Sequence, residues 1–153
     1  MVGQIYSMAS HTIIYLGAST SESDEVIDGL LASEQILSEK DEPRLLEIST
    51  ELAELGKRVL LGRGWFLRQW ILQELVLSVS PWVQCGRKRV RWKTFCSAIL
   101  TKGTPPDGDP ARVLLDMDDM RSKYWLRTDQ ERKYSLLTVG SSGGAQRFWS
   151  HKP

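Results

Sequence analysis

Between Trp65 and Ser80 the chain is so apolar that a helix formed there would have no polar face. Such a helix must be buried on most sides, so the rest of the chain has to supply the elements that cover it. Four polar side chains are nevertheless embedded in this segment: Arg68, Gln69, Gln73 and Glu74. Buried polar groups need hydrogen-bond partners, and two interpretations remain open. One is a structural network in which an arginine pairs with Glu74, and the other is a polar cluster that lines a ligand or partner site.

The segment before this one predicts a strand and two helices. His11–Gly17 is a short run of β-branched and aromatic residues closed by glycine, which is typical of a buried strand. Apolar residues at helical spacing then predict two amphipathic helices. The first runs from a Ser21–Asp24 capping box to about Ser38, and the second covers Leu45–Val59.

The segment after it predicts a hairpin and further helices. Trp82–Gly86 and Lys88–Trp92 are two short strands about a Gly86-Arg87 turn. Helices are predicted over 93–100 and 113–126, and the Gly- and Ser-rich end of the chain is predicted to be poorly ordered. This order of elements predicts a helix-rich α/β domain with a small sheet.

Opposite charges are segregated along the chain. Residues 1–56 carry 11 acidic and two basic side chains, whereas residues 57–103 carry ten basic side chains and one acidic side chain, Glu74. The net charge of +1 excludes a uniformly basic nucleic-acid binder. The basic hairpin is more typical of a strand edge protected from pairing than of a nucleic-acid surface. We interpret the two segments mainly as two faces of one domain.

Few residues carry recognisable chemistry. Cys85 and Cys96 lack the spacing of a zinc site, which predicts two buried or half-buried free thiols in a reducing compartment. The sequence has no glycine-rich phosphate loop, and neither His11 nor His151 has a nucleophile in a recognisable arrangement. No signal peptide or membrane span is visible. We therefore expect a cytoplasmic protein with no metal, no cofactor and no nucleic-acid partner.

Several blocks of the sequence resemble the fungal heterokaryon incompatibility (HET) domain. Gln4–Gly17 is similar to its "IYS-x-A … V-x-V-W-L-G" block, and Arg63–Leu75 is similar to its "R-x-WF-x-R-x-W-V-x-QE" signature. Val83–Gly86 and Val90–Trp92 resemble the strand pair and tryptophan that follow. The positions that match the family pattern are Ile5, Tyr6, Ala9, Leu16, Gly17, Trp65, Phe66, Arg68, Trp70, Gln73, Glu74, Cys85, Gly86 and Trp92.

The resemblance implies a role in fungal self/non-self recognition, in which HET domains trigger programmed cell death when incompatible hyphae fuse. Because these domains have been likened to TIR domains, it also implies a partial TIR-like or flavodoxin-like sheet flanked by helices. The family's usual "W-I-D-x-x-C-I-N-Q" segment is missing, which suggests an N-terminally truncated domain over residues 1–127, followed by a divergent, poorly ordered tail at 128–153.

Such a domain is expected to act by self-association or contact with a protein partner. The signature residues between Trp65 and Glu74 would hold the central helix in register. Two alternatives remain: a TIR-like NAD hydrolase, which would make the family an enzyme, and an inactive fragment.

Overall fold

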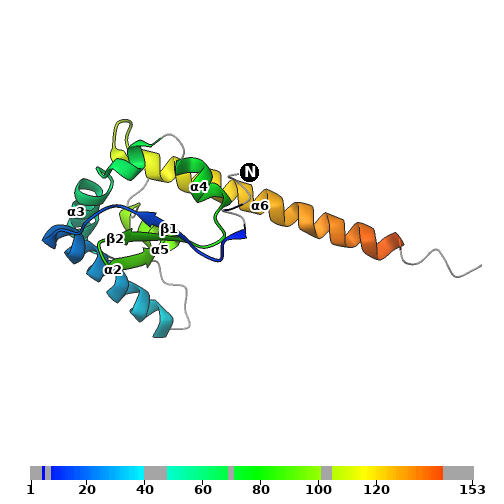
Figure 1. The fold of residues 1–153 in the computed structure, drawn as a ribbon, viewed down its shortest axis with the longest axis horizontal. Coiled ribbons are helices and arrows are strands. Elements are labelled where there is room, and N and C mark those ends of the chain that lie inside the picture. The colour runs from blue at the N-terminus through cyan, green and yellow to red at the C-terminus, as the bar shows by residue number, and fades with distance from the viewer. Residues whose placement is uncertain (1–4, 6–7, 40–47, 69–70, 101–104, 143–153) are drawn as a thin grey trace, which may run out of the picture.

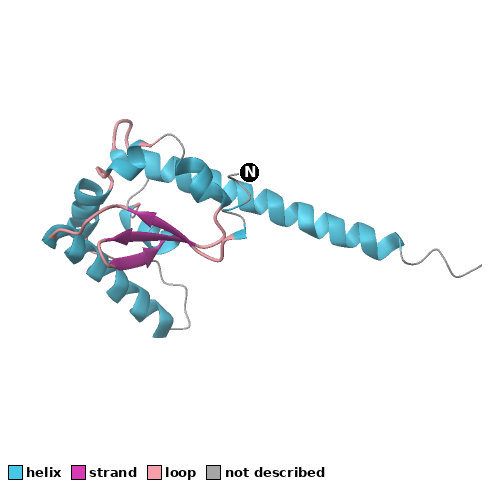
Figure 2. Ribbon diagram, in the orientation of Figure 1, coloured by secondary structure: helices cyan, strands magenta, loops and turns pink. Residues whose placement is uncertain are grey.

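The computed structural model describes residues 5, 8–39, 48–68, 71–100 and 105–142 (Figure 1). Helices dominate, and three short strands lie among them (Figure 2). The elements in chain order are β1 (Thr12–Tyr15), α2 (Ser21–Glu39), α3 (Thr50–Leu60), the 3-10 helix η1 (Gly64–Leu67), α4 (Ile71–Leu77), β2 (Pro81–Cys85), β3 (Lys88–Arg91), α5 (Trp92–Ile99) and α6 (Pro110–Ser142).

The three strands form one mixed sheet in the order β1-β2-β3. β1 runs parallel to β2, and β2 pairs antiparallel with β3 in the predicted hairpin. The register places Ile14, Val83 and Val90 side by side, and all three are buried. The structure therefore confirms the predicted α/β class, in which helices flank a small sheet.

The start of α2 differs from the predicted capping box. The backbone N–H of Ser23 donates to Thr20 Oγ1 at 3.2 Å, and the backbone N–H of Thr20 donates to Ser23 Oγ at 2.7 Å. The reciprocal pair is therefore Thr20 and Ser23, not Ser21 and Asp24. Ser23 is buried, whereas Ser21 is exposed. A pattern in the sequence cannot show which of two adjacent hydroxyls turns inward.

Helix α3 is shorter than predicted. Ser49 caps it by accepting a hydrogen bond from the backbone N–H of Leu52 at 3.2 Å, so Ile48 lies before the helix, and Leu45 lies outside the described residues. The most buried face is made by Ala53, Gly56 and Leu60 rather than by the predicted leucine stripe. The small residues allow close approach: a Cβ atom at Gly56 would collide with Ile99.

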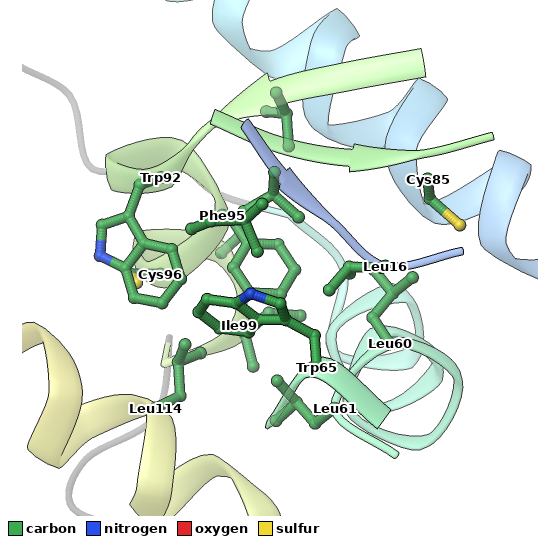
Figure 3. Close-up of a cluster of buried hydrophobic side chains, with 14 of the residues drawn as sticks. Leu16, Leu60, Leu61, Trp65, Cys85, Trp92, Phe95, Cys96, Ile99 and Leu114 are labelled. Atoms are coloured by element: carbon green, nitrogen blue, oxygen red, sulfur yellow. The ribbon is translucent and has the colours of Figure 1, made fainter. Parts of the chain in front are cut away.

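The core lies between the sheet and the helices (Figure 3). Trp92, Phe95 and Ile99 of α5 fill its centre, with Trp65 of η1 beside them. The core also contains Leu16, Leu60, Leu61 and Leu114, which come from the segment after β1, from α3 and the residue after it, and from α6. Cys85 and Cys96 are free and buried, as predicted.

The prediction of one continuous helix from Trp65 to Ser80 is wrong. The segment begins as η1, then turns extended at Arg68, which has φ −86° and ψ 136°, before α4 starts at Ile71. The prediction that this helix is buried on most sides is also wrong, because Leu67 is 81% exposed and Val79 is 53% exposed. The break places the buried Trp65 and Ile71 on two separate short helices.

Two further elements differ from the sequence prediction. Strand β1 is only half buried, because Ile13 and Tyr15 face outward with 48% and 54% of their surface exposed. Helix α6 is longer than the predicted helix over 113–126 and runs from Pro110 to Ser142. Its C-terminal part projects away from the rest of the molecule (Figure 1) and occupies residues 128–142 of the predicted poorly ordered tail. The rest of that tail lies outside the described residues, and the boundary at 127 stays a prediction.

Candidate functional site

Three of the family-like blocks meet at the loop between β1 and α2. The carbonyl of Gly17 accepts a hydrogen bond from the backbone N–H of Gly86 at 2.8 Å. The next carbonyl, that of Ala18, accepts one from Arg63 Nη1 at 2.9 Å and faces Cys85 Sγ at 3.7 Å. Segments far apart in the sequence are therefore joined at the carboxyl ends of the two parallel strands.

The two glycines of this loop and hairpin are required by their backbone geometry. Gly17 has φ +102° and Gly86 has φ +57°, a region that disfavours residues with a Cβ atom. A Cβ atom at Gly86 would also lie 2.6 Å from Ser19 Oγ. These contacts give a packing reason for Gly17 and Gly86 in the pattern. Leu16 is buried beside them.

The aromatic residues of the family pattern belong to one cluster. Trp65 lies 5.0 Å from Phe66 in an edge-to-face arrangement and 6.4 Å from Trp92, measured between ring centroids. Phe95, which the pattern does not include, stacks on Phe66 at 6.4 Å and lies 6.0 Å from Trp92. Such pairs add stability beyond the burial of their area. Trp65, Phe66 and Trp92 therefore hold η1 against α5.

A clamp that sequence reasoning missed holds the end of α4. Arg121 of α6 donates from Nη1 to the carbonyls of Leu75 at 2.8 Å and Ser78 at 2.5 Å, and from Nη2 to the carbonyl of Val79 at 3.3 Å. The last carbonyls of a helix lack partners within the helix, and a guanidinium can satisfy several of them at once. The contact joins residues more than 40 positions apart, so no local pattern signals it.

The residues beside this clamp have altered acid–base properties. Trp92 Nε1 donates to Asp118 Oδ1 at 2.9 Å, which ties α5 to α6. Burial, with a smaller contribution from Asp118, raises the pKa of the Cys96 thiol well above its ordinary range. Burial also lowers the pKa of the Arg121 guanidinium, and Asp118 opposes this effect. Cys96 is thus held as a neutral thiol, which is the unreactive form.

The polar side chains of α4, Gln73 and Glu74, have no partner among the described residues. Glu74 is half-buried, and neither an ion pair nor a hydrogen bond joins its side chain to any described residue, so the expected arginine partner is not found there. Gln73 is exposed and lines an apolar groove of about 640 Å³ between α4 and α6, together with Leu72, Val76, Met120 and Tyr124. Two cationic side chains, Lys123 and Arg127, complete its lining. The arrangement suits contact with another molecule better than an internal network.

The remaining pattern residues are scattered. Ile5 is exposed, and Ala9 is half-buried. The carbonyl of Ile5 accepts a hydrogen bond from the backbone N–H of Ala9 at 3.1 Å. Arg68 is exposed at the break between η1 and α4. Tyr6 and Trp70 lie outside the described residues. The functional roles of the pattern residues stay predictions.

Two other properties bear on function. Within the described part of the chain, no group of three or more His, Cys, Asp or Glu side chains is arranged to hold a metal ion. Among the helices of that same part, none is both long and apolar enough to span a membrane.

Comparison with known proteins agrees with the sequence blocks. Residues 1–74 match the family model described as "Heterokaryon incompatibility protein (HET)". No curated protein and no solved structure matches the chain. The matched range contains β1, α2, α3 and η1 and ends at Glu74 in α4, so Cys85, Gly86 and Trp92 lie beyond it. Residues 1–74 of this chain therefore belong to the heterokaryon incompatibility family.

Proposed function

We propose that this chain is a cytoplasmic protein-interaction module in fungal self/non-self recognition, whose signalling leads to programmed cell death. The family of residues 1–74 supports the biological setting. The state of Gln73 and Glu74 carries the molecular part of the proposal. Both belong to the signature, both are at least partly exposed, and the described residues give their side chains no hydrogen-bond partner. An exposed amide that lines an apolar groove, with a carboxylate that has no described partner next to it in the sequence, is suited to a protein partner.

The rest of the signature supports this role indirectly. Trp65 and Phe66 fix η1 on the core, and Arg121 fixes the end of α4. Gln73 and Glu74 are therefore presented on a short helix whose C-terminal end is held by Arg121. A rigid presentation reduces the entropy lost when a partner binds.

Inducible expression in fungal hyphae tests the proposal. Expression of the wild-type chain should be toxic, and the Gln73→Ala/Glu74→Ala variant should lose toxicity while its thermal unfolding matches the wild type. Asp129→Ala, on the outer part of α6, serves as a matched surface control that keeps toxicity. A wild-type chain that leaves hyphae unharmed would contradict the proposal. Rapid NAD consumption by the purified chain would favour the TIR-like hydrolase instead.

A further inference from the structure

One face of the sheet is open. The strand register places Ile13, Trp82 and Arg91 in one row across the sheet, and Tyr15, Gln84 and Arg89 in the next row on the same face, with the β2 residue in the middle of each row. These residues point opposite to the buried row of Ile14, Val83 and Val90, because successive side chains of a strand alternate between faces. We call Ile13, Tyr15, Trp82, Arg89 and Arg91 the open sheet face. Figure 2 shows α5 behind the strands and no described helix in front of them.

The positive charge of this face is not neutralised by the described residues. Arg89 and Arg91 lie over the Trp82 ring, at 5.2 and 5.5 Å from its centroid, and neither forms an ion pair in the described part of the chain. Lys88 is on the same strand but on the opposite face, and it pairs with Asp28 at 2.7 Å and with Asp24 at 3.9 Å. Asp24 and Asp28 of α2 therefore pair with Lys88. Glu34 of α2 lines a cavity together with Arg91 and Trp82 but forms no ion pair with any described residue.

A second surface of the same chain has the opposite charge. Glu25 of α2 and Glu51 and Glu54 of α3 line a groove of about 280 Å³, with the half-buried Leu52 and Leu55 along it. We call these five residues the acidic groove. Arg58 also lines this groove, but it forms an ion pair with Glu22 at 3.5 Å, so the unpaired charges of the groove are negative. Glu54 pairs with Lys57 at 2.8 Å, but Glu25 and Glu51 have no ion pair with any described residue. The groove thus offers free carboxylates next to aliphatic side chains.

We propose that copies of this chain associate head to tail, with the acidic groove of one copy bound to the open sheet face of the next. The two surfaces carry opposite charges. Each also has apolar side chains, which are Leu52 and Leu55 in the acidic groove and Ile13 and Tyr15 on the open sheet face. Opposite potentials orient such an encounter and determine its register. Since the two surfaces are different, each copy can use both, and the assembly can grow. The inference rests on the proposed role as an interaction module.

The geometry favours a protein over a nucleic acid as the occupant of the open sheet face. Bases bind to sheets by stacking on free aromatic rings. Here two guanidiniums already lie over the Trp82 ring, which leaves Tyr15 as the freely exposed ring of the open sheet face. Guanidiniums that lack carboxylate partners are suited to the glutamates of the acidic groove.

Two charge-reversed variants test the assembly. Arg89→Glu/Arg91→Glu reverses the charge of the open sheet face and leaves the acidic groove intact. Glu25→Lys/Glu51→Lys reverses the charge of the acidic groove and leaves the open sheet face intact. The mass of the wild-type chain, measured by light scattering, should rise with protein concentration at about 0.1 M salt and fall towards the monomer at about 1 M, where the screening length shrinks from about 10 Å to about 3 Å. Each variant alone should associate at least ~10-fold more weakly than the wild type.

The equimolar mixture of the two variants is the decisive sample. It should regain association in which the two variants alternate, because the intact acidic groove of one variant meets the intact open sheet face of the other, and the two reversed surfaces also carry opposite charges. A chain that carries all four reversals should associate again, since its charges are exchanged rather than removed. Circular dichroism and thermal unfolding of each variant show that it is folded.

Three results would overturn the inference. The wild-type chain could remain monomeric at about 0.1 M salt, the mixed variants could remain separate, or a monomeric wild-type chain could bind a single-stranded oligonucleotide through Arg89 and Arg91. Toxicity in hyphae is a separate readout. A toxic but monomeric chain contradicts the assembly alone, whereas a chain without toxicity contradicts the proposed function.

Discussion

The two faces of the sheet are built from alternate residues of the same three strands, yet they differ in nearly every property. Ile14, Val83 and Val90 are almost inaccessible and join a core that includes residues of α2 and α5. On the other face, Ile13 and Tyr15 are about half exposed, and the arginines of β3 on the same face have no described carboxylate partner. The buried face therefore carries the stability of the sheet, whereas the proposed interaction falls to the open sheet face.

Two tryptophans should differ most. Trp92 is 2% exposed and hydrogen-bonded to Asp118, whereas Trp82 is half-buried on the open sheet face. Trp92→Ala should lower the free energy of unfolding by about 3–5 kcal/mol, because it leaves a cavity and an unpaired Asp118. Trp82→Ala should lower it by about 1 kcal/mol, the range of an exposed cation–π contact and partial burial. Urea titrations followed by circular dichroism measure both values, and equal losses would contradict the division.

The clamp on α4 is expected to contribute the next largest effect. Arg121→Met keeps the aliphatic stem but leaves the carbonyls of Leu75 and Ser78 without their donor. The free energy of unfolding should fall by about 1–3 kcal/mol. Lys123→Met is the matched control on the same helix, because its pair with Asp119 is exposed and should contribute less than ~0.5 kcal/mol. If the control destabilises as much as Arg121→Met, the clamp has no special role.

The buried thiol predicts a pH dependence of stability. The unfolded chain releases the Cys96 proton near the ordinary thiol pKa of about 8.5, whereas the folded chain retains it to a higher pH. Above that value the unfolded state binds fewer protons, so stability falls as pH rises until the folded pKa is reached, by up to about 1.4 kcal/mol per pH unit. The difference in unfolding free energy between wild type and Cys96→Ala should therefore shrink above about pH 9. A difference that stays constant with pH would disprove this linkage.

Local patterns predicted much of the fold. The hairpin and the strand predicted over His11–Gly17, which forms over Thr12–Tyr15, follow from residue type and period. The free cysteines follow from their spacing and residue type. The sequence did not predict the features that depend on distant contacts. One is the extended backbone at Arg68, which divides the predicted helix into η1 and α4. The other is the clamp by which Arg121 joins α6 to α4.

The candidate site was less predictable than the fold. An arginine partner was expected for Glu74 because the surrounding segment is rich in basic residues. Ion pairing depends on tertiary geometry, however, and in the structure Arg121 donates to the carbonyls of Leu75 and Ser78. The exposure of Ile13 and Tyr15 depends on the sheet order and on which face the helices cover. The separation of charges along the chain was visible in the sequence. Its use as two surfaces could be inferred only from the structure, in which Arg89 and Arg91 lie on the sheet face opposite to that of the buried Val90.

The smallest effect on stability is expected on the open sheet face. Tyr15→Ser should change the free energy of unfolding by no more than ~0.5 kcal/mol, because more than half of the side chain is already in water. The same substitution should weaken self-association measurably by light scattering. A large loss of stability would show that the ring belongs to the core.

The buried face should maintain the fold while the open sheet face carries the proposed self-association. Light scattering and urea unfolding of Arg89→Glu/Arg91→Glu, measured on one preparation, separate these two roles. We expect a free energy of unfolding within ~0.5 kcal/mol of the wild type, together with self-association at least ~10-fold weaker. A variant that is equally stable and associates as strongly as the wild type would contradict this division.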